Sequence, residues 1–388
     1  MLKVISLFSG IGAFEKALTN IGVEYDLLHF CEIDKFAPLS YCAIHNEPLS
    51  KNLGDITTVD IESLPHCDLI THGSPCQDFS IAGLQAGADG GTRSSLMWNT
   101  VEIVSHCKPS YVIWENVKNV LSDNHIHNYD KYVNRLDELG YASYSKVLNA
   151  KDYGIPQNRE RIFIVSIKKE LKQSFEFPKK QKLGLRLKDM LESEVDEKYY
   201  LSEKMVQGFI KKDIGGEGTA ILIPQAVIAA SRGRGEENKQ QLEVNEQGLC
   251  NTLTSVQKDN YVVEPQVMCI NTKDENGIQP HQHDRIYDTN GIMVALSASE
   301  VSGRNNIIHD YRIRKLTPKE CYRLMGFTDE DFYKAKGVPT SDSQLYHQAG
   351  NSIVVAVLEP IFENLLINKT FGESPHEANI QTMLGGIE

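Results

Sequence analysis

The sequence predicts a doubly wound, mostly parallel α/β sheet accompanied by a second, smaller β-rich domain. Two observations support this prediction. Up to about residue 170, short apolar runs alternate with helical patterns, as in parallel sheets that carry helices on both faces. After Phe177-Pro178 the chain is polar and glycine-rich until about residue 310, and its apolar runs are short.

The elements of the first domain follow from these apolar runs. Phe14, Ala17 and Leu18 share one face of a helix that begins near Gly12, because residues three and four apart lie on the same side. The expected strands span residues 4–8, 25–31, 69–71, 111–114 and 161–165, and the expected helices span 12–18, 94–107 and 129–139.

The second domain begins after a charge run at residues 179–182, which is typical of a solvated linker. Within it, residues 248–254 resemble residues 291–297, and each segment is followed by a polar loop and a further strand, at 261–263 and at 307–308. They are either two tandem hairpin-like units or two unrelated strands with similar turns, since two copies do not define a repeat.

Helical character returns after Leu316. Thr317-Pro318-Lys319-Glu320 has the pattern of a capping box with proline at the first helical position, and an apolar helix spans residues 353–366. We therefore expect a first domain of residues 1–178 completed by 345–370, a second domain of 179–344, and a flexible tail of 371–388.

Composition restricts the class of protein. The chain has 388 residues, of which 41% are hydrophobic and 24% charged, and no apolar run approaches the roughly 18–20 residues that span a bilayer. The first residues lead directly into a strand pattern, so we expect no signal peptide. The eight cysteines form no Cys-x-x-Cys pair, so we expect no metal site, no disulfide framework and a reducing cytoplasm. A net charge of −12 argues mildly against nucleic acid, although a local cleft potential can oppose the average.

A glycine-rich loop, residues 8–12, links the first strand to the first helix. Glycine lets backbone approach a ligand beside a helix N-terminus, although tight turns without a ligand look the same. Glu32, about twenty residues on, can accept hydrogen bonds from both ribose hydroxyls. Phe14 and Glu15 fill the region of the third dinucleotide glycine, so a nucleoside without phosphate, such as S-adenosylmethionine, fits better than NAD. Asp55 either accepts from an adenine amino group or caps a loop.

Cys76 follows the strand at 69–71 within Gly73-Ser74-Pro75-Cys76-Gln77. Open α/β sheets hold their ligands at this carboxyl edge, so Cys76 is a candidate nucleophile, with a structural or redox thiol as the alternatives.

Two further motifs end at the same edge. Glu115-Asn116 follows the strand at 111–114, and Glu115 either faces the cleft or forms a salt bridge at the surface. Alternation places Gln157, Arg159 and Arg161 on one face of the next strand. Two guanidinium groups there can hold a base carbonyl or a phosphate and favour a nearby thiolate. The alternative is that the arginines form ordinary ion pairs at the end of the strand.

The order and spacing of these motifs resemble those of bacterial and phage DNA cytosine-5 methyltransferases. The matching motifs run from residue 4 to about 366 and are Phe8-x-Gly10-x-Gly12, Glu32, Pro75-Cys76-Gln77, Glu115-Asn116-Val117, Gln157-x-Arg159-x-Arg161, Arg314-Lys315-Leu316-Thr317-Pro318-x-Glu320 and Gly350-Asn351-Ser352.

The resemblance implies a Rossmann-like methyltransferase fold whose second domain is a target recognition domain. It also implies methyl transfer from S-adenosylmethionine to C5 of a cytosine in a specific short duplex DNA sequence, after the base is flipped. Cys76 would add to C6 and make C5 enamine-like. Glu115, which needs a raised pKa, would protonate N3 and hold the base together with Arg161. Arg159 would support the thiolate and the phosphate backbone, and Gln157 would complete the catalytic set.

The resemblance also assigns binding residues. The cofactor site would comprise Phe8, Gly10, Ile11, Gly12, Glu32, Ile33, Asp55, Ile56, Pro75, Leu96, Asn351 and Ser352, so the last helix should pack back into the first domain. Candidate DNA contacts are Ser80, Arg232, Arg234, Thr252, Arg285 and Arg304. Ala13 replaces a frequent glycine. Ala295 stands where many members have threonine, whereas the first of the two similar segments keeps Thr252, so either segment is a candidate for reading bases.

Two other functions compete with this one. The first is a tRNA cytosine-5 methyltransferase on the same fold, although the long recognition segment favours duplex DNA. The second is a nucleic-acid-binding relative without activity, which the intact Cys76, Glu115 and arginine pair argues against. For the DNA enzyme we expect monomeric action, with a separately encoded restriction endonuclease as a candidate partner and no membrane association.

Overall fold

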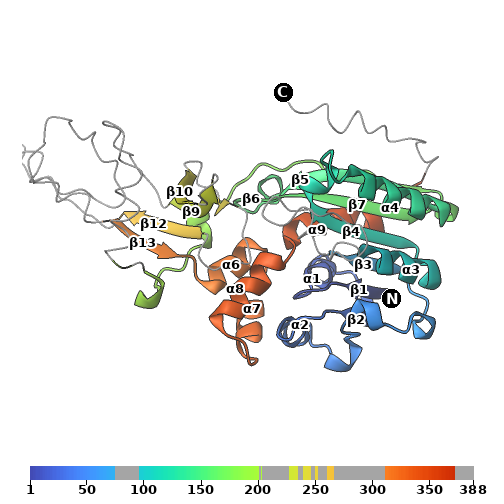
Figure 1. Ribbon diagram of the computed structural model, residues 1–388, viewed down its shortest axis with the longest axis horizontal. Helices are drawn as coiled ribbons and strands as arrows, with labels where there is room; N and C mark the ends of the chain where they lie inside the picture. Colours follow the sequence, from blue (N-terminus) through green and yellow to red (C-terminus); the bar gives the residue numbers. More distant parts are fainter. Residues whose placement is uncertain are drawn as a thin grey trace, which may run out of the picture.

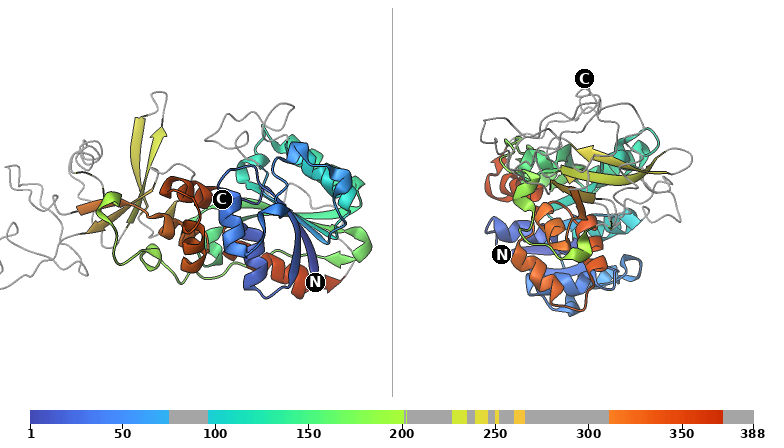
Figure 2. Two further views of the ribbon diagram at one scale, coloured as in Figure 1. Left: turned by 90° about the horizontal axis from the view of Figure 1, so that it is seen from below. Right: turned by 90° about the vertical axis from the view of Figure 1, so that its left-hand side faces the viewer.

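The computed structural model describes residues 1–74, 96–200, 202, 227–234, 239–245, 250–251, 260–265 and 311–371. Within these ranges a central sheet has helices on both faces, and a smaller sheet lies beyond a group of helices at one end (Figure 1). Figure 2 shows the smaller sheet at the opposite end of the molecule from the central strands.

The described strands of the central sheet number six, in the order β2-β1-β3-β4-β7-β5. They are β1 (Leu2–Leu7), β2 (Tyr25–Cys31), β3 (Leu69–His72), β4 (Tyr111–Val117), β5 (Tyr141–Asn149) and β7 (Glu160–Lys168). The first four run parallel, whereas β7 runs antiparallel to β4 and β5. The mostly parallel sheet is thus confirmed. β5 is absent from the predicted strands because serines and a lysine interrupt its apolar residues.

Alternation along the strands builds two separate cores. Val4 and Leu69 face one core, whereas Ile5 and Ile70 face the other, as expected for a sheet buried on both sides. The first core includes side chains of α1 (Ala13–Asn20), α2 (Ala37–His45) and α9 (Val355–Phe362), and the second includes side chains of α3 (Met97–Cys107) and α4 (Ile126–Glu138). α2 is absent from the predicted helices, and α1, α3 and α4 agree with them.

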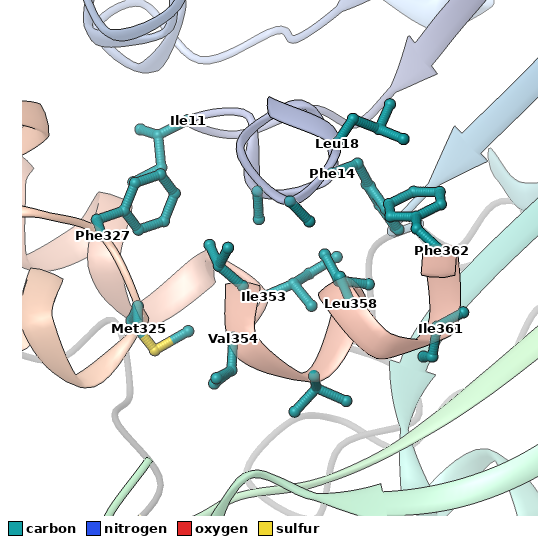
Figure 3. Close-up of a cluster of buried hydrophobic side chains, with 14 of the residues drawn as sticks. Ile11, Phe14, Leu18, Met325, Phe327, Ile353, Val354, Leu358, Ile361 and Phe362 are labelled. Atoms are coloured by element: carbon teal, nitrogen blue, oxygen red, sulfur yellow. The ribbon is translucent and has the colours of Figure 1, made fainter. Parts of the chain in front are cut away.

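The C-terminal helix α9 returns to the first domain, as predicted. Phe362 packs edge-on against Phe14 of α1, with ring centroids 6.3 Å apart, and Ile353 and Leu358 lie beside them (Figure 3). Short strands β8 (Gln173–Ser174) and β14 (Thr370–Phe371) pair next to this helix. Residues 372–388 of the predicted tail lie outside the described residues.

Among the described residues, one helical stretch, Asp342–Ile367, has the length and composition to cross a membrane. It comprises α8 (Asp342–Asn351), α9 and the π-helical turn Glu363–Ile367, and α8 and α9 are separated at Ser352, whose backbone is extended. Val355, Leu358 and Ile361 have 0% exposure, which identifies the stretch as part of the core.

The smaller sheet is antiparallel, and its described strands follow the order β10-β9-β12-β13. They are β9 (Val227–Arg234), β10 (Lys239–Asn245), β12 (Asn260–Pro265) and β13 (Tyr311–Lys315). Strand β11 (Cys250–Asn251) pairs instead with β6 (Gln157–Asn158) of the first domain. The predicted hairpin-like unit is therefore wrong for the first segment, because its strands join different sheets. The second segment, 291–308, lies outside the described residues.

Three helices connect the two sheets, α6 (Pro318–Leu324), α7 (Asp329–Lys336) and α8 (Asp342–Asn351), and each begins with a capping box. The predicted box at Thr317 and Glu320 is confirmed. Met325 and Phe327 share the core of Ile11 and α1 (Figure 3). Leu316 and the apolar side chains of these three helices are therefore buried in the same core as α1.

A buried ion pair lies where the chain passes from β13 of the smaller sheet to helix α6. Arg314, at the end of β13, and Glu320 of α6 both have side-chain exposures of 0%, and Arg314 Nη1 lies 2.8 Å from Glu320 Oε2. The carboxylate also accepts from the backbone N–H of Thr317 and of Glu192, each at 2.8 Å. The chain segment before the smaller sheet, at Glu192, and the last described strand of that sheet, at Arg314, therefore both contact the Glu320 carboxylate.

Candidate active site

The glycine-rich loop turns sharply between β1 and α1. Phe8, Gly10 and Gly12 have positive φ angles of 55°, 55° and 82°. A Cβ on Gly12 would lie 2.2 Å from His45 Nε2, whereas one on Gly10 would meet no atom of the described residues within 4 Å. Gly12 is thus required by packing against α2, and Gly10 is the glycine that leaves space for a ligand.

Glu32 lies beside this loop at the end of β2. Its Oε2 accepts from the Gly10 N–H at 2.8 Å and its Oε1 from the Asp34 N–H at 2.9 Å. Burial raises the pKa of Glu32, although these backbone donors oppose the shift. Each carboxylate oxygen has a further lone pair for a ligand hydroxyl, and the neighbouring Ile33 is 72% exposed. This polar and apolar pair fits the ribose and base of a nucleoside.

Asp55 acts as a cap in the described structure. Its Oδ1 accepts from the N–H and the hydroxyl of Thr57, both at 2.9 Å, while Ile56 is buried. Leu96 precedes α3 and packs against the second core. Asn52, which no sequence motif marks, joins the loop of Asp55 to the backbone of Glu32.

Glu115 and Arg161 form an ion pair at the carboxyl end of β4. Arg161 Nε lies 3.1 Å from Glu115 Oε1, and their side chains are 17% and 10% exposed. Burial raises the pKa of Glu115, while Arg161 and Arg159 act in the opposite direction. A Cβ on Gly73 would lie 3.6 Å from Glu115 Oε2, so the end of β3 lies against the same carboxylate.

The predicted alternation of Gln157, Arg159 and Arg161 is present, because Asn158 and Glu160 between them are exposed. Arg159 is 4% exposed, and its Nη2 donates to the carbonyls of Gly350 at 3.1 Å and of Ser352 at 2.8 Å. It thereby connects the far C-terminal motif to the sheet, with Ser352 buried and Asn351 exposed.

Gln157, predicted to be part of the catalytic set, is buried next to α6. It has 0% exposure, and its Nε2 donates to the Leu324 carbonyl at 2.8 Å. Its amide therefore holds the end of α6 within the core.

Ser74, the last described residue before Cys76, is held by the two neighbours of Glu115 in β4. Trp114 Nε1 donates to Ser74 Oγ at 3.0 Å, and Asn116 Nδ2 donates to the Ser74 carbonyl at 3.4 Å. Pro75, Cys76 and Ser80 lie outside the described residues. Ser74 shows no recognisable signal in the sequence beyond its place before the Pro-Cys step.

The candidate DNA contacts are described only in part. The backbone of Arg232 lies opposite Gln241 and that of Arg234 opposite Lys239 in the smaller sheet. Thr252, Arg285 and Arg304 lie outside the described residues.

The family model for C-5 cytosine-specific DNA methylases matches residues 2–366. The chain belongs to this family. It is 35% identical over 441 aligned residues to the orphan methyltransferase M.SPRI of Bacillus phage SPR, covering 95% of this chain and 99% of the relative. It is 33% identical to the type II methyltransferase M.HhaI of Haemophilus parahaemolyticus, covering 94% of each.

Among solved structures, the fold is similar to that of the S. pombe Dnmt2 methyltransferase, with a TM-score of 0.58, 18% identity, and coverage of 94% of this chain and 98% of the other. Membership of the family shows that the protein is a DNA cytosine-5 methyltransferase that uses S-adenosylmethionine, and favours DNA over the tRNA alternative.

Proposed function

We propose that the protein methylates one cytosine within a specific short duplex DNA sequence, after flipping that base into the site formed by Cys76, Glu115 and Arg161. The observation that supports this most directly is the Glu115–Arg161 pair, which lies beside Gly73, three residues before Cys76 in the chain. A carboxyl and a guanidinium at one point match the donor and acceptor edge of cytosine.

In this mechanism the Cys76 thiolate adds to C6, and the Glu115 carboxyl donates a proton to N3 as negative charge develops in the ring. The raised pKa of Glu115 supports this role. Arg161 orients the carboxyl and donates to the base carbonyl in this mechanism. After transfer, loss of the C5 proton allows Cys76 to leave by elimination. Gln157 and Arg159 position the arginine strand and the C-terminal motif, and Arg159 also favours the thiolate.

We assign the cofactor site to the loop at Phe8–Gly12, with Glu32 for the ribose, Ile33 for the adenine face and Asp55 for the adenine edge. Open space at Gly10 and the exposed Ile33 fit this assignment. S-adenosylmethionine, when bound, supplies an electrophilic methyl group. Pro75, Leu96, Asn351 and Ser352 complete the site.

We assign target recognition to the smaller sheet and the segments between its strands, from about residue 202 to 315. Arg232 and Arg234 are its candidate contacts in the described strands, since arginine is the commonest reader of guanine. We also propose monomeric action in the cytoplasm. A separately encoded endonuclease is a candidate partner. Methylation itself does not require one, and the phage relative is named an orphan methyltransferase.

The test is transfer of labelled methyl groups from S-adenosylmethionine to unmethylated genomic DNA, followed by bisulfite sequencing, with total tRNA as a parallel substrate. We expect label on cytosine within one fixed short sequence and none on tRNA. Cys76→Ser should abolish transfer and retain cofactor binding. Label on tRNA alone, or full activity of the serine variant, would contradict the proposal.

A further inference from the structure

Asn52 makes a compact set of hydrogen bonds between two loops that the proposed cofactor site needs. Its Oδ1 accepts from the Glu32 N–H at 3.0 Å and from the Gly54 N–H at 3.1 Å, and its Nδ2 donates to the Glu32 carbonyl at 3.0 Å. One amide thus binds both backbone polar groups of Glu32. This fixes the rotation of the peptide units on either side of that residue.

Neighbouring contacts hold the same two loops together. The Leu53 N–H donates to the Phe30 carbonyl at 2.7 Å, and Cys31 Sγ donates to the Gly54 carbonyl at 3.0 Å. Gly54 itself has a φ of +74°, a conformation that side chains rarely adopt. The segment before Asp55 is therefore joined to the end of β2 over three consecutive residues.

We propose that Asn52 is a positioning residue for S-adenosylmethionine, which makes the carboxylates of Glu32 and Asp55 one preformed cradle for the nucleoside. This inference rests on the proposed roles of Glu32 and Asp55. The carboxylate of Glu32 also accepts from Gly10, so Asn52 connects, through Glu32, the glycine-rich loop with the loop of Asp55. A cradle ordered before binding avoids the entropic cost of ordering these loops around the ligand.

The test measures the Kd of S-adenosylmethionine for the full chain by calorimetry, together with KM for the cofactor and kcat on unmethylated genomic DNA. Asn52→Ala should raise both Kd and KM about tenfold or more, because several hydrogen bonds that orient Glu32 and Gly54 are lost. The kcat at saturating cofactor and the affinity for DNA should stay within about twofold. Asn364→Ala is the matched control, because this asparagine donates to the Glu176 carbonyl away from the loops; its Kd should be unchanged.

Two further variants keep the outcomes distinct. Asn52→Asp has the same shape and keeps the Oδ1 acceptor but loses the Nδ2 donor, so it should weaken binding several-fold even if the alanine variant does not fold. Glu32→Gln tests the proposed function itself. If the folded Asn52 variants bind the cofactor with normal affinity while Glu32→Gln binds it more weakly, the inference about Asn52 is overturned and the assignment of the cofactor site is not. Equal losses of cofactor affinity and DNA affinity in the Asn52 variants would also overturn the inference. Normal affinity of Glu32→Gln would overturn the assignment of the cofactor site.

Discussion

Replacing Glu320 with alanine should destabilise the protein more than almost any other single change at a charged residue. The carboxylate accepts from Arg314 Nη1 at 2.8 Å and Nη2 at 3.0 Å, and both side chains have no exposure. Removing one partner of a buried ion pair leaves the other charge uncompensated, which costs about 3–5 kcal/mol. The backbone N–H groups of Thr317 and Glu192 lose the same acceptor, which adds roughly 1 kcal/mol or more for each.

The assay is equilibrium unfolding in urea at neutral pH, followed by far-UV circular dichroism. Glu330→Ala is the matched control, because its ion pair with Lys334 is exposed and is worth about 0.5 kcal/mol or less. Combining Glu320→Met with Arg314→Met should recover part of the loss, since no buried charge then remains. If Glu320→Ala unfolds at the same urea concentration as Glu330→Ala, the argument from the buried pair is refuted.

Other predictions follow from the loop, the candidate acid and the helix contacts. Gly12→Ala should lower the urea midpoint strongly, because its Cβ would lie 2.2 Å from an α2 side chain. Gly10→Ala should cost only about 1–2 kcal/mol for its positive φ and chiefly raise the Kd of the cofactor; equal midpoints for the two variants would contradict this. Glu115→Gln should lower kcat by about 10²–10⁴-fold. Because burial raises the pKa of Glu115, the wild-type rate should fall as pH rises through that raised pKa, and a flat profile would argue against proton donation. Burial alone would raise the pKa of Asp331, but hydrogen bonds from Lys16 and Thr328 outweigh it and lower the pKa. Its stabilising effect is therefore present at neutral pH and lost as pH falls below the ordinary aspartate range, so Asp331→Asn should flatten the acid limb of stability measured by urea midpoints.

The sequence predicts the central sheet well because its strands are buried on both faces and read as continuous apolar runs. It predicts β5 poorly, since an edge strand with serines and a lysine lacks that run. The same contrast holds in the site. The motifs locate Glu32, Glu115 and Arg161, whose chemistry follows from residue type and position at the sheet edge. They do not reveal Asn52, nor the contact that Gln157 makes with the Leu324 carbonyl, because both depend on backbone atoms brought close by folding.

The return of α9 to α1 has a consequence for synthesis of the chain. The apolar face of α1, with Phe14 and Leu18, is covered by residues that lie after 350 in the sequence. At about 5–20 residues per second, the ribosome needs roughly 10–40 s to add the residues that separate the end of β7 from the end of α9. During that interval the nascent domain lacks one wall of its core, and no partly made chain has Ser352 bound to Arg159. Methylation competence therefore arises only after α9 has been made, and chains that terminate before α9 carry an exposed apolar face that favours their aggregation and removal.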